Sequence, residues 1–79
     1  MKELDNKTFI MEDGTQYEVI ENVNYNGKVY LYLVNINDEM DSIFKQLKSK
    51  DNELFLEDID SNLFKEHILE LFLNKFKDY

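Results

Sequence analysis

The 79-residue chain contains no cysteine, no proline, no tryptophan and no arginine, and only one histidine and two glycines. Without cysteine it can form no disulfide, which fits a reducing compartment. A single histidine without cysteine excludes a closed structural zinc site. No apolar run approaches the ~18 residues of a membrane span, and the polar N-terminus lacks the apolar stretch of a signal peptide. We therefore expect a soluble, cytoplasmic protein of a bacterial cell that does not bind membranes.

The charge is strongly one-sided. Seventeen acidic residues face nine basic ones, all lysine, and give a net charge of −8. Direct nucleic-acid binding needs Lys or Arg to displace counterions, and Arg is the usual reader of phosphate and guanine. The composition therefore argues against nucleic acid as a ligand and favours a basic protein partner. The same charge would also serve solubility alone, as in many small domains.

Catalytic motifs are missing. The chain has no glycine-rich phosphate loop and no cysteine nucleophile. Its serines lack the context of a nucleophile elbow, and we expect His67 to lie on the helix surface or its boundary. The segment 35–41 lacks the central glycine and terminal glutamate of a calcium loop. We expect neither an enzyme nor a cofactor, and no metal.

Turn signals organise the first half of the chain. Asp13-Gly14 and Asn26-Gly27 separate runs of strand-type residues, as in β-hairpins. A polar, acidic loop is expected over 37–41 and another turn over 49–52. The predicted strands cover residues 7–11, 16–25, 28–36, 42–48 and 53–57.

The last segment has helical periodicity. Apolar residues recur at spacings of three and four, which predicts one helix over 61–77. Asp60 is the expected N-cap, with Ile59 and Phe64 forming a hydrophobic staple. The apolar stripe consists of Phe64, Ile68, Leu71, Phe72, Phe76 and Tyr79, and Leu69 and Leu73 widen it.

Strand register assigns side chains to faces. Two-residue turns at both signals would pair Tyr25 with Lys28, Val23 with Tyr30, and Ile10 with Tyr17. The expected core face then carries Ile10, Tyr17, Val19, Val23, Tyr25, Tyr30, Tyr32, Val34 and Ile36. The other face carries Phe9, Met11, Ile20, Val29, Leu31 and Leu33 among polar residues. Because Glu21 falls on the core face, a β-bulge is expected near Ile20-Glu21.

These elements define an α+β domain: a curled antiparallel meander of four to five strands with one C-terminal helix packed on one face. One helix covers only one sheet face. The sheet therefore either curls, so that strands four and five cover the second face, or leaves Phe9, Met11, Leu31 and Leu33 open as a binding patch.

The residues Thr8–Gly14, Tyr17–Ile20, Tyr25–Lys28 and Tyr30-Leu31 resemble the YrzB-like family of small acidic Gram-positive proteins. The family pattern is an apolar strand ending in an acidic-Gly turn, a Glu/Val strand, an Asn-Gly turn, and a Lys- and Tyr-containing strand. The resemblance covers about residues 8–76, and divergent relatives of this kind are also encoded by phages. The family has no established activity, so the resemblance implies a fold but no catalytic residues.

Clustered acidic residues suggest a function. Two such clusters could converge and imitate the phosphates of a nucleic acid, which predicts a non-catalytic inhibitor, of a phage or anti-CRISPR-like type, occupying the basic groove of a nucleic-acid-handling protein. The expected contact residues are Asp38, Glu39, Asp41, Glu57, Asp58 and Asp60. The alternative is a bacterial housekeeping or structural protein, or a homodimer, that associates through the apolar residues Phe9, Met11, Leu31, Leu33, Leu69 and Leu73.

Overall fold

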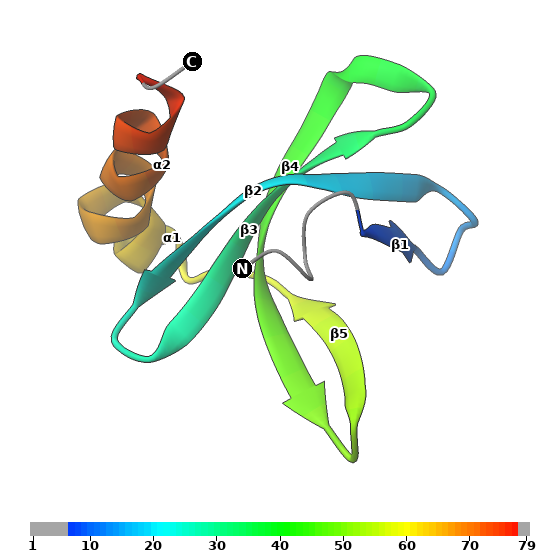
Figure 1. Ribbon diagram of the computed structural model, residues 1–79, viewed down its shortest axis with the longest axis horizontal. Helices are drawn as coiled ribbons and strands as arrows, with labels where there is room; N and C mark the ends of the chain where they lie inside the picture. The colour runs from blue at the N-terminus through cyan, green and yellow to red at the C-terminus, as the bar shows by residue number, and fades with distance from the viewer. Residues whose placement is uncertain (1–6, 78–79) are drawn as a thin grey trace.

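The computed structural model describes residues 7–77 and confirms the curled antiparallel sheet with one C-terminal helical segment (Figure 1). The five strands lie side by side in chain order, so each pairs with its sequence neighbours. Their bounds are β1 Thr8–Ile10, β2 Gln16–Tyr25, β3 Lys28–Asn35, β4 Asp38–Lys50 and β5 Glu53–Glu57. The helical segment runs from Ser61 to Phe76. The N-terminal residues 1–6 and the predicted stripe member Tyr79 lie outside the described residues.

Two hairpin turns have the geometry of two-residue loops. Asn26 and Gly27 both adopt positive φ, at 51° and 77°, and Tyr25 pairs with Lys28 as predicted. Asp51 and Asn52 also adopt positive φ and connect β4 to β5. Positive φ at both central residues is the type I′ geometry, which matches the twist of the flanking strands. These turns fix the register of the β2–β3 and β4–β5 pairs.

The first turn is longer than predicted. Met11 N donates to Thr15 O at 2.8 Å, which leaves a three-residue loop with Gly14 in the left-handed region. Tyr17 therefore pairs with Phe9, and the predicted pairing with Ile10 is wrong. A one-residue shift moves every side chain to the other face. Phe9 accordingly packs against the core, whereas Ile10 is 69% exposed.

The predicted bulge is present, since the β2–β3 register shifts between Val19 and Glu21. It splits the expected core face in two. Val23 lies on the helix side with Tyr30, whereas Val19 pairs with Leu33 and packs on the opposite side. Tyr17 follows Val19 to that side, and Ile20, at the bulge, is exposed. The assignment of Tyr17 and Val19 to the helix-facing core was therefore wrong.

The predicted loop over 37–41 is also wrong. β3 ends at Asn35, a short turn follows, and β4 begins at Asp38. The side chain of Asn35 accepts a hydrogen bond from Asn37 N at 2.8 Å, which closes the turn locally. The acidic residues of this segment therefore lie on an ordered hairpin, and Ile36, expected in the core, is half exposed.

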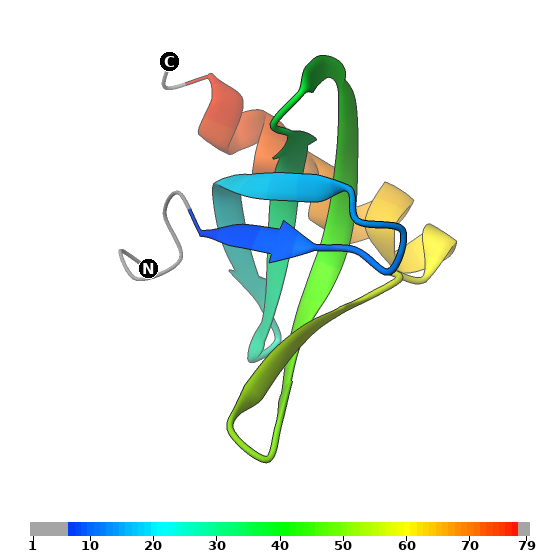
Figure 2. The same cartoon turned by 90° about the vertical axis from the view of Figure 1, so that its right-hand side faces the viewer.

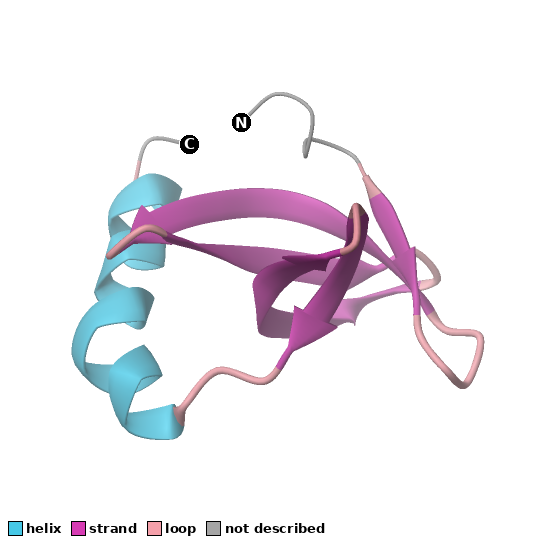
Figure 3. Ribbon diagram, turned by 90° about the horizontal axis from the view of Figure 1, so that it is seen from below, coloured by secondary structure: helices cyan, strands magenta, loops and turns pink. Residues whose placement is uncertain are grey.

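Each face of the curled sheet has its own core. On the concave side Val19, Leu31 and Leu33 are buried, and residues of β1, β4 and β5 pack against them. On the other side Val23 and Tyr30 are buried against Ile68 and Phe72 of the helical segment. Figure 3 shows this segment against one side of the sheet, away from β1. Figure 2 looks onto the opposite side, where β1 and β5 are the two edge strands.

The helical segment begins as predicted. The Asp60 carboxylate accepts a hydrogen bond from Leu63 N at 3.0 Å and so acts as the N-cap. Ile59 and Phe64, the expected staple pair, both pack against the helix-side core. The segment is not one uniform helix, because a π-helical turn over Phe64–Ile68 separates α1 (Ser61–Leu63) from α2 (Leu69–Phe76).

Candidate functional site

A hydrogen-bond network fixes the start of β4. Tyr17 Oη donates to Asp41 Oδ2 at 2.7 Å, and Asn35 Nδ2 donates to the same oxygen at 3.1 Å. These bonds lower the pKa of Asp41, because both favour its charged form. The Asp41 carboxylate in turn raises the pKa of Tyr17. Side chains from β2, β3 and β4 thus hold one carboxylate in place.

Two acidic turns lie near enough to this network for their charges to act on it. The negative charge of Asp13, in the β1–β2 loop, acts on both Tyr17 and Asp41, and the charge of Asp38 also acts on Tyr17. Both carboxylates are positioned by their own turns: Asp13 accepts from Thr15 N at 2.9 Å and Asp38 from Met40 N at 3.0 Å. The first bond also lowers the pKa of Asp13. We call Asp13, Asp38 and Asp41 the acidic turn cluster.

The end of the β3–β4 hairpin exposes apolar side chains beside this cluster. Met40 is 87% exposed and lies in the run Asp38-Glu39-Met40-Asp41. Ile36, in the turn, is half exposed. The hairpin extends beyond the rest of the sheet in Figure 1. The hairpin end therefore combines an exposed large apolar side chain with the acidic residues next to it in the sequence.

The second predicted acidic group lies elsewhere and is largely paired. Asp58 forms an ion pair with Lys45, which lowers the Asp58 pKa, and Glu57 pairs with Lys48 at 3.0 Å. Asp60 caps the helix. Glu57 pairs in register with Gln46, five residues from Asp41 along β4, or about 16 Å at the rise of a strand. The six predicted contact residues therefore divide into two sites. The run Asp38–Asp41 lies near Asp13, which was not among the predicted contact residues.

The six residues of the predicted apolar interface differ in their exposure. Leu31 and Leu33 are fully buried, so their expected role as an open patch is wrong. They are covered because the sheet curls and brings Leu56 of β5 over them. Leu69 is partly buried, and Leu73 is exposed. Phe9 and Met11 are partly buried and line a cleft.

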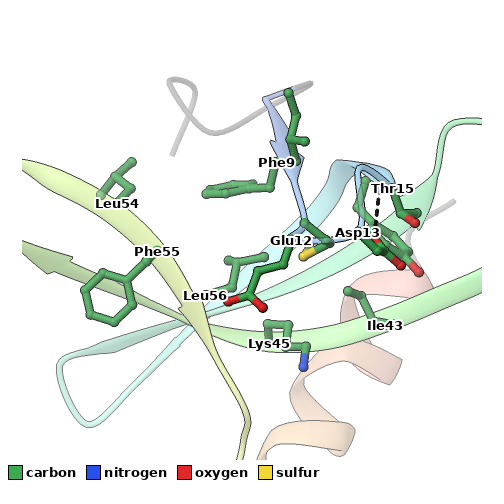
Figure 4. Close-up of a pocket in the computed structure, with 12 residues that line it drawn as sticks. Phe9, Glu12, Asp13, Thr15, Ile43, Lys45, Leu54, Phe55 and Leu56 are labelled. Carbon is green, nitrogen blue, oxygen red and sulfur yellow. Dashed lines mark hydrogen bonds between the residues drawn. The ribbon is translucent and has the colours of Figure 1, made fainter.

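This cleft of about 700 Å³ lies on the open side of the sheet, between β1 and β5. Figure 4 shows its walls: Phe9 extends from β1, and Leu54, Phe55 and Leu56 come from β5. Glu12 and Asp13 lie at the β1 end, and Lys45 of β4 lines the floor, with its amine turned away toward Asp58. Sequence reasoning missed the cleft because it forms only when the sheet curls and brings its two edges together.

Other chemistry is sparse. His67 is exposed and its ring stacks on Tyr25, with centroids 5.2 Å apart. Over residues 7–77, no group of three or more His, Cys, Asp or Glu side chains is placed to hold a metal ion. No helix in the same range has the length and apolar character needed to cross a bilayer.

No protein-family model, curated protein or solved structure matches the chain. The resemblance to the YrzB-like family therefore stays a prediction, and the functional argument rests on the molecule's own surfaces.

Proposed function

We propose that this chain is a non-catalytic protein-binding module that places the end of its β3–β4 hairpin in the basic groove of a nucleic-acid-handling protein. In its most specific form it is a phage-type inhibitor, similar in action to an anti-CRISPR protein, in the bacterial cytoplasm. One observation carries the proposal: Met40 is 87% exposed within the acidic run Asp38–Asp41, at a hairpin end that the Tyr17–Asp41 bond holds in place.

Rigidity supports this role. The hydrogen bonds that Tyr17 and Asn35 donate to Asp41, and the turn bond that Met40 N donates to Asp38, fix the carboxylates before any partner binds. A pre-organised surface loses less conformational entropy on binding. The Met40 side chain would then supply apolar contact area in the centre of the interface, where binding energy concentrates.

Charge supports a basic partner. The acidic turn cluster joins carboxylates from two separate turns, and the chain as a whole carries −8. None of these three carboxylates forms a salt bridge with a described lysine, unlike Asp58 and Glu57. Such a surface speeds association with a positive groove and makes it sensitive to salt.

The test is an affinity pulldown from a low-GC Gram-positive lysate with the tagged protein and two variants. Asp38→Lys with Glu39→Lys reverses the exposed charges and leaves the Tyr17–Asp41 bond intact. Leu73→Asp is the matched control on the exposed helix surface. We expect a basic partner that the wild type and the Leu73 variant retain at low salt, and that high salt or the double reversal removes.

The apolar alternative keeps one supporting observation, the exposed side chain of Leu73 on α2. A partner, or a homodimer, that resists high salt and is lost only in Leu73→Asp would replace the inhibitor proposal with association through the helix.

A further inference from the structure

The sheet is open between its first and last strands. β1 pairs only with β2 and β5 only with β4, so over residues 7–77 each has one edge without a strand partner. Both edges border the same cleft. A second, smaller hollow continues between them, lined by Thr8 and Ile10 on one side and Glu53 and Leu54 on the other. Natural proteins usually protect such edges.

The direction of the free backbone groups on β5 follows from its hairpin. In a two-residue turn the flanking residues, here Lys50 and Glu53, form a hydrogen-bonded pair. Hydrogen-bonded and non-bonded pairs then alternate, so Glu53, Phe55 and Glu57 bond to β4. The N–H and C=O groups of Leu54 and Leu56 therefore point outward, away from β4.

Apolar side chains accompany this free backbone. Leu54 is 43% exposed and Phe55 is 41% exposed, on opposite faces of a five-residue strand. Across the cleft Ile10 of β1 is more exposed still. Unpaired backbone together with exposed apolar residues is the combination that β-strand addition uses, in which main-chain bonds give affinity and side chains give specificity.

The charges of β5 favour a strand of another protein over a second copy of β5 at this edge. The sequence of β5 is Glu-Leu-Phe-Leu-Glu, so the antiparallel register that pairs all five residues of two copies sets Glu53 opposite Glu57 twice. Like charges directly opposite each other are destabilising, and each copy carries −8. A strand of another protein with Lys or Arg at these positions instead meets Glu53 and the half-exposed Glu57, which it shares with Lys48, favourably.

We propose that the outer edge of β5 receives an extended segment of a partner protein as a sixth strand, with apolar central residues and a Lys or Arg at each end. The segment bonds to the free groups of Leu54 and Leu56, and its side chains enter the cleft toward β1. This inference does not rest on the hairpin function proposed above, because it uses a different edge of the molecule.

The probe is the capped peptide Lys-Val-Tyr-Val-Lys, titrated by NMR at millimolar concentration and physiological salt. In the antiparallel register the two lysines of the peptide lie opposite Glu53 and Glu57. The backbone N–H and C=O groups of its two valines form hydrogen bonds with those of Leu56 and Leu54. We expect shifts and slowed exchange at the Leu54 and Leu56 amides. The matched peptide with Glu at both ends should bind at least about tenfold more weakly, because like charges then face each other.

Leu54→Pro tests the backbone bond in the protein. Because the Leu54 N–H points outward, proline is tolerated there without loss of a β4–β5 bond. We expect it to weaken peptide binding about tenfold relative to Leu54→Ala, which keeps the N–H. A second test leaves the protein unchanged: N-methylation of both valines of the peptide should abolish binding, and N-methylation of its tyrosine should not.

Absence of shifts at Leu54 and Leu56, or equal binding of the valine-methylated peptide, would overturn the proposal. Dimerisation of the protein alone that Leu54→Pro prevents would also overturn it, by making a second copy the occupant. The double reversal at Asp38 and Glu39 should leave peptide binding intact. Failure of this inference is thereby separated from failure of the hairpin function.

Discussion

Tyr17 and Asp41 connect two strands that are not neighbours in the sheet. Tyr17 lies in β2 and Asp41 in β4, with β3 between them, and the phenol donates to the carboxylate at 2.7 Å. This bond crosses the face of the intervening strand, where Asn35 of β3 adds a second donor. It holds the projecting hairpin end against the body of the sheet and so sets the position of the proposed contact residues.

A double-mutant cycle should detect this connection. We expect Tyr17→Phe and Asp41→Ala each to lower the free energy of unfolding, and the double variant to lose less than their sum, because either change already removes the bond. Urea denaturation provides the measurement. Tyr25→Phe is the control, since Tyr25 lies on the same strand but packs on the helix side. Strict additivity of Tyr17→Phe and Asp41→Ala would contradict the account.

The hydrogen bond between Tyr17 and Asp41 should stabilise the fold only between two pH limits. The Asp41 pKa is lowered in the folded state, so its contribution to stability is complete above the ordinary carboxyl pKa of about 3.9 and is lost as pH falls further. The Tyr17 pKa is raised, so its contribution is complete below about 10 and is lost as pH rises through the folded value. The stability difference between wild type and Tyr17→Phe should therefore be greatest between these limits and shrink on both sides.

Local signals explain what the sequence could predict. Asn26-Gly27 set one register correctly, Asp60 marked the helix start, and the misplaced Glu21 indicated the bulge, since each feature depends on a few adjacent residues. The Asp13-Gly14 signal gave the wrong β1–β2 register, because an Asp-Gly pair suits both two- and three-residue loops. That one-residue difference exchanged Phe9 and Ile10 between core and surface.

The candidate site was less predictable. The approach of Asp13 to Asp41 depends on the twist of three strands, and the ion pairs of Asp58 and Glu57 depend on the β4–β5 register. The pattern of acidic residues could indicate neither. The cleft between β1 and β5 needed the curl of the whole sheet, which no local signal measures.

The two cores should unfold together, because β2 and β3 contribute to both. We expect Leu33→Ala to cost about 2–5 kcal/mol and Phe72→Ala about 3–5 kcal/mol, since both side chains are fully buried. Chemical denaturation followed by near-UV and far-UV signals should give one coincident transition for each variant. Separate transitions for the sheet and the helix would contradict a single cooperative unit.

The helix cap offers a sharper comparison. Asp60→Ala removes the bond to Leu63 N and should lower the free energy of unfolding by about 1 kcal/mol. Asp60→Asn keeps an acceptor oxygen and should lose much less. Ser61→Ala, at the next position, controls for helix propensity. Equal losses for the Ala and Asn variants would mean that the cap bond does not contribute.

The central claim is that Met40 lies at the partner interface, and site-specific photo-crosslinking tests it most directly. A photoreactive amino acid would replace Met40 in one protein and exposed Asn62, on α1, in another, and both would be irradiated in a low-GC Gram-positive lysate. We expect a basic, nucleic-acid-handling protein crosslinked from position 40 alone, with the yield falling at high salt and after charge reversal at Asp38 and Glu39. Equal crosslinking from both positions, or a salt-resistant product from position 62 only, would contradict the account.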